Sequence, residues 1–163
     1  MKIRRARPED ALIIAQINVE TWQDAYKGLI DDDILKTRKV DEKRISGWLK
    51  NIENPNCVVL VCEDGGLKGY LSAGAARDDF GIEHEIYALY VKPSAQRKGV
   101  GTELIKGYRK TIKNESFYLY MLKNNFKAAR FYEKNGGVIC EKFNRTLNVD
   151  NQTIDEVCWV FEQ

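Results

Sequence analysis

Histidine is almost absent from this chain, and proline is scarce. There is one histidine, His84, and there are three prolines among 163 residues. The four cysteines, Cys57, Cys62, Cys140 and Cys158, have no spacing that fits a zinc site. With no second histidine beside them, no catalytic metal is expected. Cys57 and Cys62 lie in an apolar run, so we expect buried, reduced thiols and a cytoplasmic location.

Long apolar runs and an excess of charge of either sign are also missing. No apolar run approaches the length of a membrane span, and polar sequence rather than the apolar core of a signal peptide follows Met1–Arg5. The formal net charge is only +2, and no basic arm is present, so neither nucleic acid nor a membrane is an expected partner. No linker or repeat interrupts the chain, which predicts a single domain over residues 1–163.

Apolar periodicity predicts an α/β (α+β) fold. The pattern favours a mixed, mostly antiparallel twisted sheet of about seven strands flanked by helices on both faces. The segment 83–122 is typical of a right-handed parallel crossover. A turn is predicted at 148–152. Helices are predicted at 8–26, 41–52, 100–112 and 127–135, and strands at 2–7, 57–62, 67–76, 83–91, 116–122, 138–143 and 155–161.

The most informative stretch is the junction between a strand and a helix at 89–102. An apolar run ends at Pro93, and the polar segment Gln96-Arg97-Lys98-Gly99-Val100-Gly101 leads into an amphipathic helix. The start of a helix presents free backbone N–H groups, and the helix dipole favours negative charge there. Glycine allows the backbone to approach a ligand closely. The junction therefore predicts an anion cradle, with phosphate as the expected ligand.

Three blocks together carry a family resemblance. Gln96–Gly101 resembles the (Gln/Arg)-x-x-Gly-x-(Gly/Ala) signature of the GCN5-related N-acetyltransferases (GNAT), and Leu89–Pro93 precedes it at the family's spacing. Downstream, Asn125–Gly136 resembles the family's Asn-x-x-Ala-x-x-x-Tyr-x-x-x-Gly block. The resemblance implies an acetyl-CoA-dependent N-acetyltransferase. One departure is Gly137, where the family usually has phenylalanine, and it leaves the packing of the following strand open.

The resemblance also implies which residues hold coenzyme A. The glycine turn binds the pyrophosphate, and a bulge near Leu89 and Tyr90 frees backbone N–H groups for the pantetheine arm and the thioester oxygen. Asn125 fits a helix cap by residue type alone, and a bond to the pantetheine amide is a second role. The expected cofactor residues are Leu89, Tyr90, Val91, Gln96, Arg97, Lys98, Gly99, Val100, Gly101, Thr102, Asn125 and Tyr132.

Acetyl transfer to an amine needs a base and an acid. An alkyl ammonium has a pKa near ~10.4 and must lose a proton before it attacks. Alternation along an extended strand places Glu83, Glu85, Tyr87 and Leu89 on one face. The resemblance implies a general base near Glu85, acting directly or through water, with Glu83 as the second candidate; a solvated strand-end carboxylate is the alternative. It also implies that Tyr132 protonates the leaving thiolate, although a core tyrosine would fit the same pattern.

The acceptor side is less specific. The segment Thr21–Leu29 resembles a branch of the family that includes spermidine/spermine acetyltransferases. Trp22 and Tyr26, with the carboxylates at 31–33, suit a cationic small-molecule amine, although Trp22 also fits a core position and the acids a solvated loop. Transfer to a protein or peptide N-terminus and a non-catalytic acyl-CoA-binding regulator are the alternative functions. The oligomeric state is open, a homodimer included.

Overall fold

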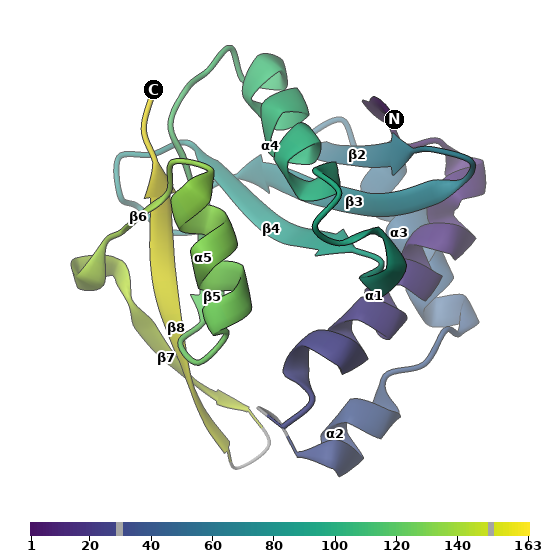
Figure 1. Ribbon diagram of the computed structural model, residues 1–163, viewed down its shortest axis with the longest axis horizontal. Helices are drawn as coiled ribbons and strands as arrows, with labels where there is room; N and C mark the ends of the chain where they lie inside the picture. The colour runs from purple at the N-terminus through teal and green to yellow at the C-terminus, as the bar shows by residue number, and fades with distance from the viewer. Residues whose placement is uncertain (29–30, 150–151) are drawn as a thin grey trace.

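The computed structural model describes residues 1–28, 31–149 and 152–163. The described strands form one mostly antiparallel sheet of eight strands in the order β1-β2-β3-β4-β5-β8-β6, with β7 paired to β8 off this path (Figure 1). β4 and β5 are parallel, and the connection between them passes through a helix. The strands are β1 (Lys2–Arg5), β2 (Cys57–Glu63), β3 (Leu67–Ala75), β4 (His84–Val91), β5 (Phe117–Leu122), β6 (Val138–Ile139), β7 (Arg145–Val149) and β8 (Gln152–Phe161).

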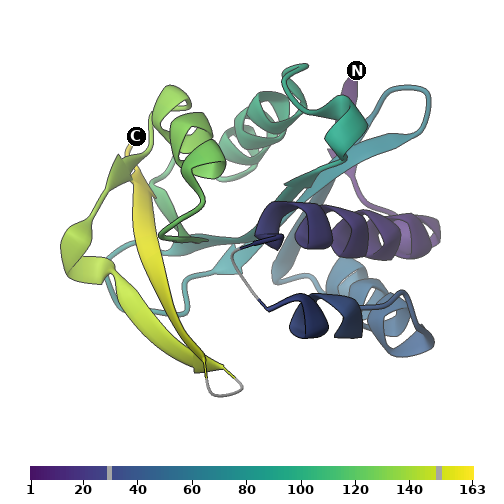
Figure 2. The same ribbon diagram turned by 60° about the horizontal axis from the view of Figure 1, so that its bottom comes forward.

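Helices cover both faces of the sheet, as the sequence predicts. Figure 2 shows α4 and α5 on one face and α1 and α3 on the other. None of the described helices is long and apolar enough to cross a membrane. The helices are α1 (Ala11–Tyr26), α2 (Asp32–Thr37), α3 (Glu42–Glu53), α4 (Val100–Thr111) and α5 (Phe126–Lys134).

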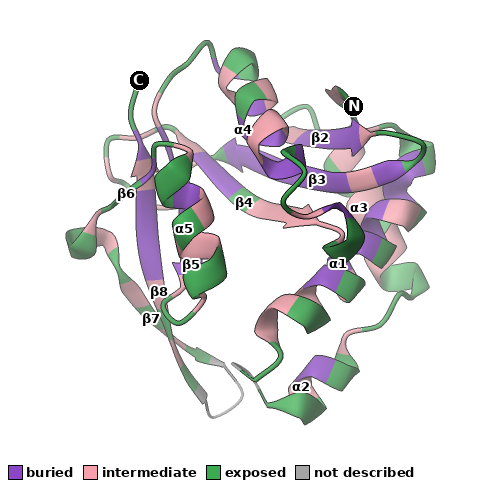
Figure 3. Cartoon of the chain, in the orientation of Figure 1, coloured by how far each residue is buried: buried purple, intermediate pink, exposed green. Residues whose placement is uncertain are grey.

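The two faces bury separate apolar clusters. Leu104, Ile105 and Tyr108 of α4 pack with the rings of Phe117 and Phe161 on one face. Ile14 and Ile17 of α1 pack on the other, against side chains of β2, β3 and α3. Figure 3 shows these buried positions running through the central strands and the inner sides of α1 and α4. Burial of these apolar side chains is the main force that holds the helices to the sheet.

Three elements, α2, β6 and β7, differ from the sequence prediction. The segment after Gly28, predicted as a loop, contains α2, which begins where the Asp31 carboxylate accepts a hydrogen bond of 2.8 Å from the Asp33 N–H. The strand predicted at 138–143 is only Val138–Ile139, since a 3-10 turn follows at 141–143. The main partner of β8 at this edge is instead β7. The turn predicted at 148–152 lies partly outside the described residues.

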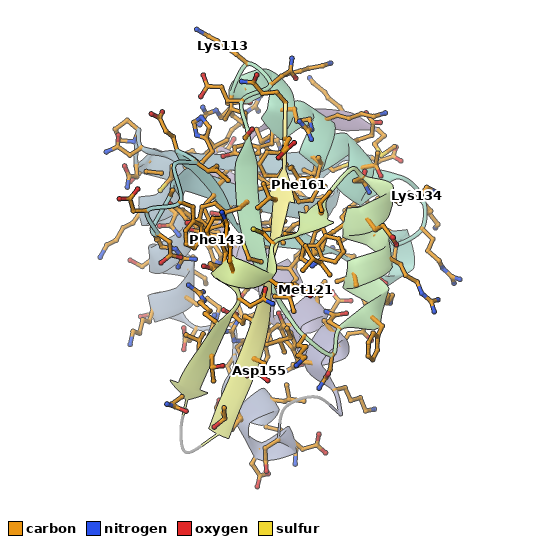
Figure 4. The ribbon with its side chains drawn as sticks, turned by 90° about the vertical axis from the view of Figure 1, so that its left-hand side faces the viewer. Lys113, Met121, Lys134, Phe143, Asp155 and Phe161 are labelled. Atoms are coloured by element: carbon orange, nitrogen blue, oxygen red, sulfur yellow. The ribbon has the colours of Figure 1, made fainter. Side chains whose placement is uncertain are left out.

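The packing around Gly137 accounts for the lack of the phenylalanine that the family resemblance leads us to expect there. A Cβ at this position would lie 2.7 Å from Cζ of Phe161 and 3.1 Å from Cε3 of Trp159. Phe161 also stacks on Phe117, with ring centroids 4.5 Å apart. Figure 4 shows Phe161 near the end of β8. Rings from β8 therefore fill the space beside Gly137, and a side chain at residue 137 would collide with them.

An ion pair ties β1 to the start of α1. Arg4 Nη1 lies 2.7 Å from Asp10 Oδ2, and the Arg7 N–H donates to the same oxygen at 2.8 Å. Desolvation raises the pKa of Asp10, but the hydrogen bonds from Arg4 and Arg7 outweigh it and lower the pKa below the ordinary value of 3.8. The ionised carboxylate is therefore the form that the fold stabilises.

We expect Asp10→Asn to lower the free energy of unfolding by about 2 kcal/mol at neutral pH. The pKa of Asp10 is lower in the folded protein than in the unfolded chain. The stabilisation by its carboxylate is therefore complete at pH values above the unfolded pKa, and it is lost as the pH falls through the folded pKa. Urea unfolding at pH 7 and at the lowest pH where the wild type stays folded measures this difference. If the free energies of unfolding of the wild type and Asp10→Asn differ by the same amount at both pH values, the ionised carboxylate is not the source of the stabilisation.

Candidate active site

The central feature of the site is the point where β4 and β5 part. The two strands pair at only three positions, which end at Ile86 opposite Leu119. Beyond this point β4 continues beside β3 as far as Val91, while β5 continues beside β8. The free edge of β4 therefore carries backbone N–H and C=O groups that a ligand can pair with. β4 is therefore splayed away from β5 beyond Ile86.

A β-bulge lies at Tyr87 rather than at Leu89 and Tyr90. Ser72 of β3 pairs with Ala88, and the next residue pairs with Ile86, so Tyr87 is the extra residue. The bulge reverses the alternation of side chains. Leu89 packs in the same cluster as Ile86, whereas Ala88 and Tyr90 pack in the cluster on the α1 face. The prediction that Glu83, Glu85, Tyr87 and Leu89 share one face is therefore wrong.

The glycine turn has the geometry of an anion cradle. Arg97 and Gly99 have positive φ angles of 59° and 85°, a left-handed conformation that turns successive N–H groups the same way. The hydrogen bond from Glu103 N to Gly99 O, 3.0 Å long, begins the helical ladder of α4. The N–H groups before Glu103 thus lack helical partners. Gln96 holds the turn to β4 through its side-chain nitrogen, 3.1 Å from Val91 O.

The second glycine of the turn has a packing role. A Cβ on Gly101 would lie 2.8 Å from Cζ of Phe131, so the glycine lets α5 pack against the start of α4. Asn125 caps α5 by accepting a bond of 3.1 Å from the Ala128 N–H, which confirms the predicted cap. The cradle and α5 are therefore held side by side by direct contact.

A groove of about 850 Å³ runs between these elements. It contains most of the residues that the sequence singles out. Glu83, Lys98 and Trp22 do not line it: Lys98 Nζ bonds Ser94 O at 2.9 Å, and Trp22 packs on Tyr26 with ring centroids 5.1 Å apart. Predicted site residues that do line it are Tyr26, Glu85, Leu89, Tyr90, Val91, Gln96, Arg97, Gly99, Val100, Gly101, Thr102, Asn125 and Tyr132.

The predicted acceptor segments contribute less than expected. The side chains at 31–33 are exposed and do not line the groove, since this segment starts α2. Leu29, the last residue of the segment that resembles spermidine/spermine acetyltransferases, lies outside the described residues. Of the two aromatic residues proposed for the acceptor side, Tyr26 at the end of α1 lines the groove and Trp22 does not. Thr21, Asp24 and Ala25 of the same segment also line it.

The Glu85 carboxylate is fully enclosed and hydrogen-bonded. Its Oε2 accepts from Arg77 Nε at 3.0 Å, from the Arg77 N–H at 3.1 Å and from the Tyr118 hydroxyl at 3.0 Å. Arg77 Nη2 pairs with the other oxygen, Oε1. The side chain of Glu85 is 1% exposed, whereas that of Arg77 is 56% exposed. Four donor contacts therefore fix this carboxylate where the loop after β3 meets β4 and β5.

Five of the described tyrosines line the groove, and three of them come from different elements: Tyr26 of α1, Tyr90 of β4 and Tyr132 of α5. Burial is the largest cause that raises the pKa of each hydroxyl. The neighbouring Tyr90 raises the pKa of Tyr132 further. The raised pKa keeps Tyr132 in its phenol form through neutral and alkaline pH, which is the form that can donate a proton.

Charged residues that sequence analysis did not single out also line the groove. Lys127, Arg130 and Lys134 lie three and four residues apart on α5, a spacing that places them on one face of the helix. With Arg97 they supply positive charge to the groove. Asp24 of α1, Arg145 of β7 and Glu156 of β8 also line the groove. The helical spacing of the cations was visible in the sequence, whereas the convergence of α1, β7 and β8 required the fold.

Comparison with known proteins identifies the family. The model of the acetyltransferase (GNAT) family matches residues 15–137, which include the cradle, the splayed strand and Tyr132. The chain belongs to the GNAT family of acetyltransferases. As a GNAT acetyltransferase, it is an enzyme and it takes its acetyl group from acetyl-CoA.

Relatives of this GNAT protein cover most of its length. It is 28% identical to an uncharacterized N-acetyltransferase, YuaI, of Bacillus subtilis over 130 residues, 76% of this chain and 72% of YuaI. It is 23% identical to spermidine N(1)-acetyltransferase of Thermoplasma acidophilum over 144 residues, 83% of this chain and 87% of that protein. The crystal structure of the PaiA N-acetyltransferase of T. acidophilum with coenzyme A matches the fold with a TM-score of 0.73 at 19% identity, over 99% of this chain and 98% of that chain.

The described residues of the GNAT protein fit acetyl-CoA. The free N–H groups at the start of α4 suit a pyrophosphate, and the cations of α5 suit additional phosphate charge. The free edge of β4 suits the amides of an extended pantetheine arm. These features follow one another along a single groove.

Proposed function

We propose that this GNAT acetyltransferase acetylates a primary amine on a small polycation of the polyamine type, by direct attack in a ternary complex. The observation that carries the proposal is the charge distribution in the groove. Arg97 of the glycine turn and Lys127, Arg130 and Lys134 of α5 line the groove as cations, whereas Asp24 of α1 and Glu156 of β8 line it as acids from other elements. Such a distribution attracts the phosphates of acetyl-CoA and a cationic acceptor to different parts of the groove.

The acceptor side has an excess of negative charge even though it contains Arg145. Arg145 Nε lies 2.7 Å from Glu156 Oε2, and Arg145 Nη1 lies 3.6 Å from Asp78 Oδ2. Its guanidinium also lies 3.6 Å from the centre of the Tyr120 ring. Arg145 is thus already neutralised by two carboxylates, and Asp24 adds a third. This arrangement favours an amine without a carboxylate over a zwitterionic amino acid.

Two groups take the remaining roles in acetyl transfer. The N–H groups at the free edge of β4 bond the thioester oxygen as negative charge develops on it. The Tyr132 hydroxyl donates its proton to the sulfur as the carbon–sulfur bond breaks and the carbon–nitrogen bond forms. The proton that the attacking nitrogen gives up on forming the amide restores the Tyr132 hydroxyl. The similarity to a spermidine acetyltransferase supports the same acceptor class.

A thiol-release assay with acetyl-CoA and an amine panel tests the acceptor class. We expect spermidine to have a higher kcat/KM than an uncharged alkylamine, an amino acid or a peptide with a free N-terminus. Asp24→Asn should raise the KM for spermidine about 5-fold, because an exposed charge pair contributes roughly 1 kcal/mol. Glu20→Gln, an exposed acid earlier on α1 that does not line the groove, is the matched control.

A peptide preferred over spermidine contradicts the polyamine proposal and favours an N-terminal acetyltransferase. Equal KM values for Asp24→Asn and the wild type contradict the electrostatic argument. Neither result affects the assignment of the cradle to the pyrophosphate of acetyl-CoA, which a separate measurement of the affinity for acetyl-CoA tests.

A further inference from the structure

Glu85 is poorly placed to accept a proton from an amine. Both of its oxygens are occupied by the Arg77 guanidinium, and Oε2 also accepts from the Tyr118 hydroxyl. The Tyr118 oxygen in turn accepts from the Arg77 and Asp78 N–H groups, each at 3.1 Å. These bonds connect β4, β5 and the loop after β3, so this carboxylate is an anchor for the loop. An acceptor amine could reach it only by displacing Arg77.

A second carboxylate in the groove is more accessible. Glu156 of β8 lines the groove, its side chain is 18% exposed, and only Oε2 is bonded, by Arg145 Nε. The described residues provide Oε1 with no hydrogen-bond donor. A carboxylate with one oxygen fixed by arginine and the other open keeps its orientation while it can still accept a proton.

Glu156 is close to the tyrosines of the groove. Its negative charge raises the pKa of both Tyr26 and Tyr90. Tyr132 and Glu156 both raise the pKa of Tyr26, so the proton donor proposed for the sulfur and Glu156 belong to one cluster. The charged and titratable groups that face this cluster are Asp24 and Tyr26 of α1, Arg38 after α2, Tyr70 of β3, Arg77 and Asp78 of the loop after β3, Tyr90 of β4, Tyr120 of β5, Tyr132 of α5 and Arg145 of β7.

We infer that Glu156, and not Glu85, takes the first proton from the acceptor ammonium. The N–H bond of the ammonium breaks and its proton passes to Glu156 Oε1, which leaves a neutral amine and a carboxylic acid. The acid then releases the proton to water, since the side chain is partly exposed. The second proton leaves the nitrogen when the amide forms and returns to Tyr132. The inference rests on amine acetylation and not on the polyamine class of the acceptor.

The pH dependence of Glu156→Gln tests this role. The variant must rely on the neutral amine in solution, whose fraction rises about tenfold per pH unit below a pKa near ~10.4. We expect its kcat/KM to be about 100-fold below the wild type at pH 7 and to approach the wild type as the pH reaches that pKa. The acceptor is spermidine, or the most active amine of the panel if another class is preferred. The affinity for acetyl-CoA should not change.

Three further variants make the result specific. Asp155→Asn changes the neighbouring acid on β8 (Figure 4), which pairs with Lys123 and does not line the groove, and should behave as the wild type. Glu156→Asp retains a carboxylate and should keep the wild-type shape of the pH profile. Glu85→Gln should lower thermal stability and also keep that shape.

The inference is wrong if Glu156→Gln has the wild-type pH profile, or if Glu85→Gln is the variant whose kcat/KM rises tenfold per pH unit. A low rate for the wild type with spermidine alone bears on the acceptor class and not on Glu156.

Discussion

Replacing Tyr132 by phenylalanine should lower kcat about 100-fold while the affinity for acetyl-CoA stays the same. The hydroxyl that we propose as the proton donor to sulfur is removed, and the ring that packs against Trp159 and Phe161 remains. General acid catalysis contributes a factor of ~10² or more when a thiolate must leave. Steady-state kinetics with a good amine acceptor measures kcat, and a direct binding titration measures the affinity.

The control for this variant is Tyr108→Phe on α4. The Tyr108 hydroxyl is buried, has no hydrogen-bond partner among the described residues and does not line the groove. Its removal should leave kcat unchanged, and because an unpaired buried hydroxyl costs free energy, stability should stay the same or rise. If Tyr132→Phe retains the wild-type kcat from neutral to alkaline pH, another group donates the proton.

Replacing Arg77 by alanine should lower the free energy of unfolding by about 3–5 kcal/mol, more than Glu85→Ala does. The loss is larger for Arg77→Ala because the two variants leave different charged groups without their partner. Without Arg77, a fully buried carboxylate remains with only neutral donors. Without Glu85, the remaining guanidinium is 56% exposed and regains water. We therefore expect a loss of about 1–3 kcal/mol for Glu85→Ala, from the hydrogen bonds of Tyr118 and the loop N–H groups.

A double-mutant cycle in urea checks this ordering. The double variant should cost less than the sum of the two single variants, because the buried charge that makes Arg77→Ala costly is absent from it. A larger loss for Glu85→Ala than for Arg77→Ala contradicts the account of Glu85 as a charge that Arg77 compensates. Arg145→Ala, which removes a half-exposed guanidinium from the groove wall, should cost less than Arg77→Ala.

Local patterns predicted the parts of the fold that depend on neighbours in sequence. The helix starting near Val100, the cap at Asn125 and the stop at Gly136 follow from turn and capping chemistry, and the structure confirms them. The strand at Arg145–Val149 was missed because its polar side chains find their hydrogen-bond partners only on the neighbouring strand β8. Arg145 pairs with Glu156, and the Thr146 hydroxyl donates to Asp155 at 2.9 Å.

The candidate site was predictable to the same extent. The glycine turn is a local motif, so its left-handed turn and the start of α4 could be predicted from the sequence. The shared face of Glu85 and Leu89 was mispredicted because the extra residue at Tyr87 interrupts alternation, and nothing in the local pattern marks a bulge. Asp24 and Glu156 come from α1 and β8, which are distant in sequence and meet in the groove only in the complete fold. Most of the predicted cofactor residues therefore line the groove, whereas few of the predicted acceptor residues do.

The placement of β8 has a consequence for how the chain folds during synthesis. β5 pairs with β8 along its whole length, and β8, residues 152–161, is synthesised after both β5 and α5. Until those residues leave the ribosome, β5 is an unpaired edge, and the space beside Gly137 lacks the rings of Trp159 and Phe161. The nascent enzyme can bury the α1 side of its sheet early, but the α5 side is completed only once β8 has emerged.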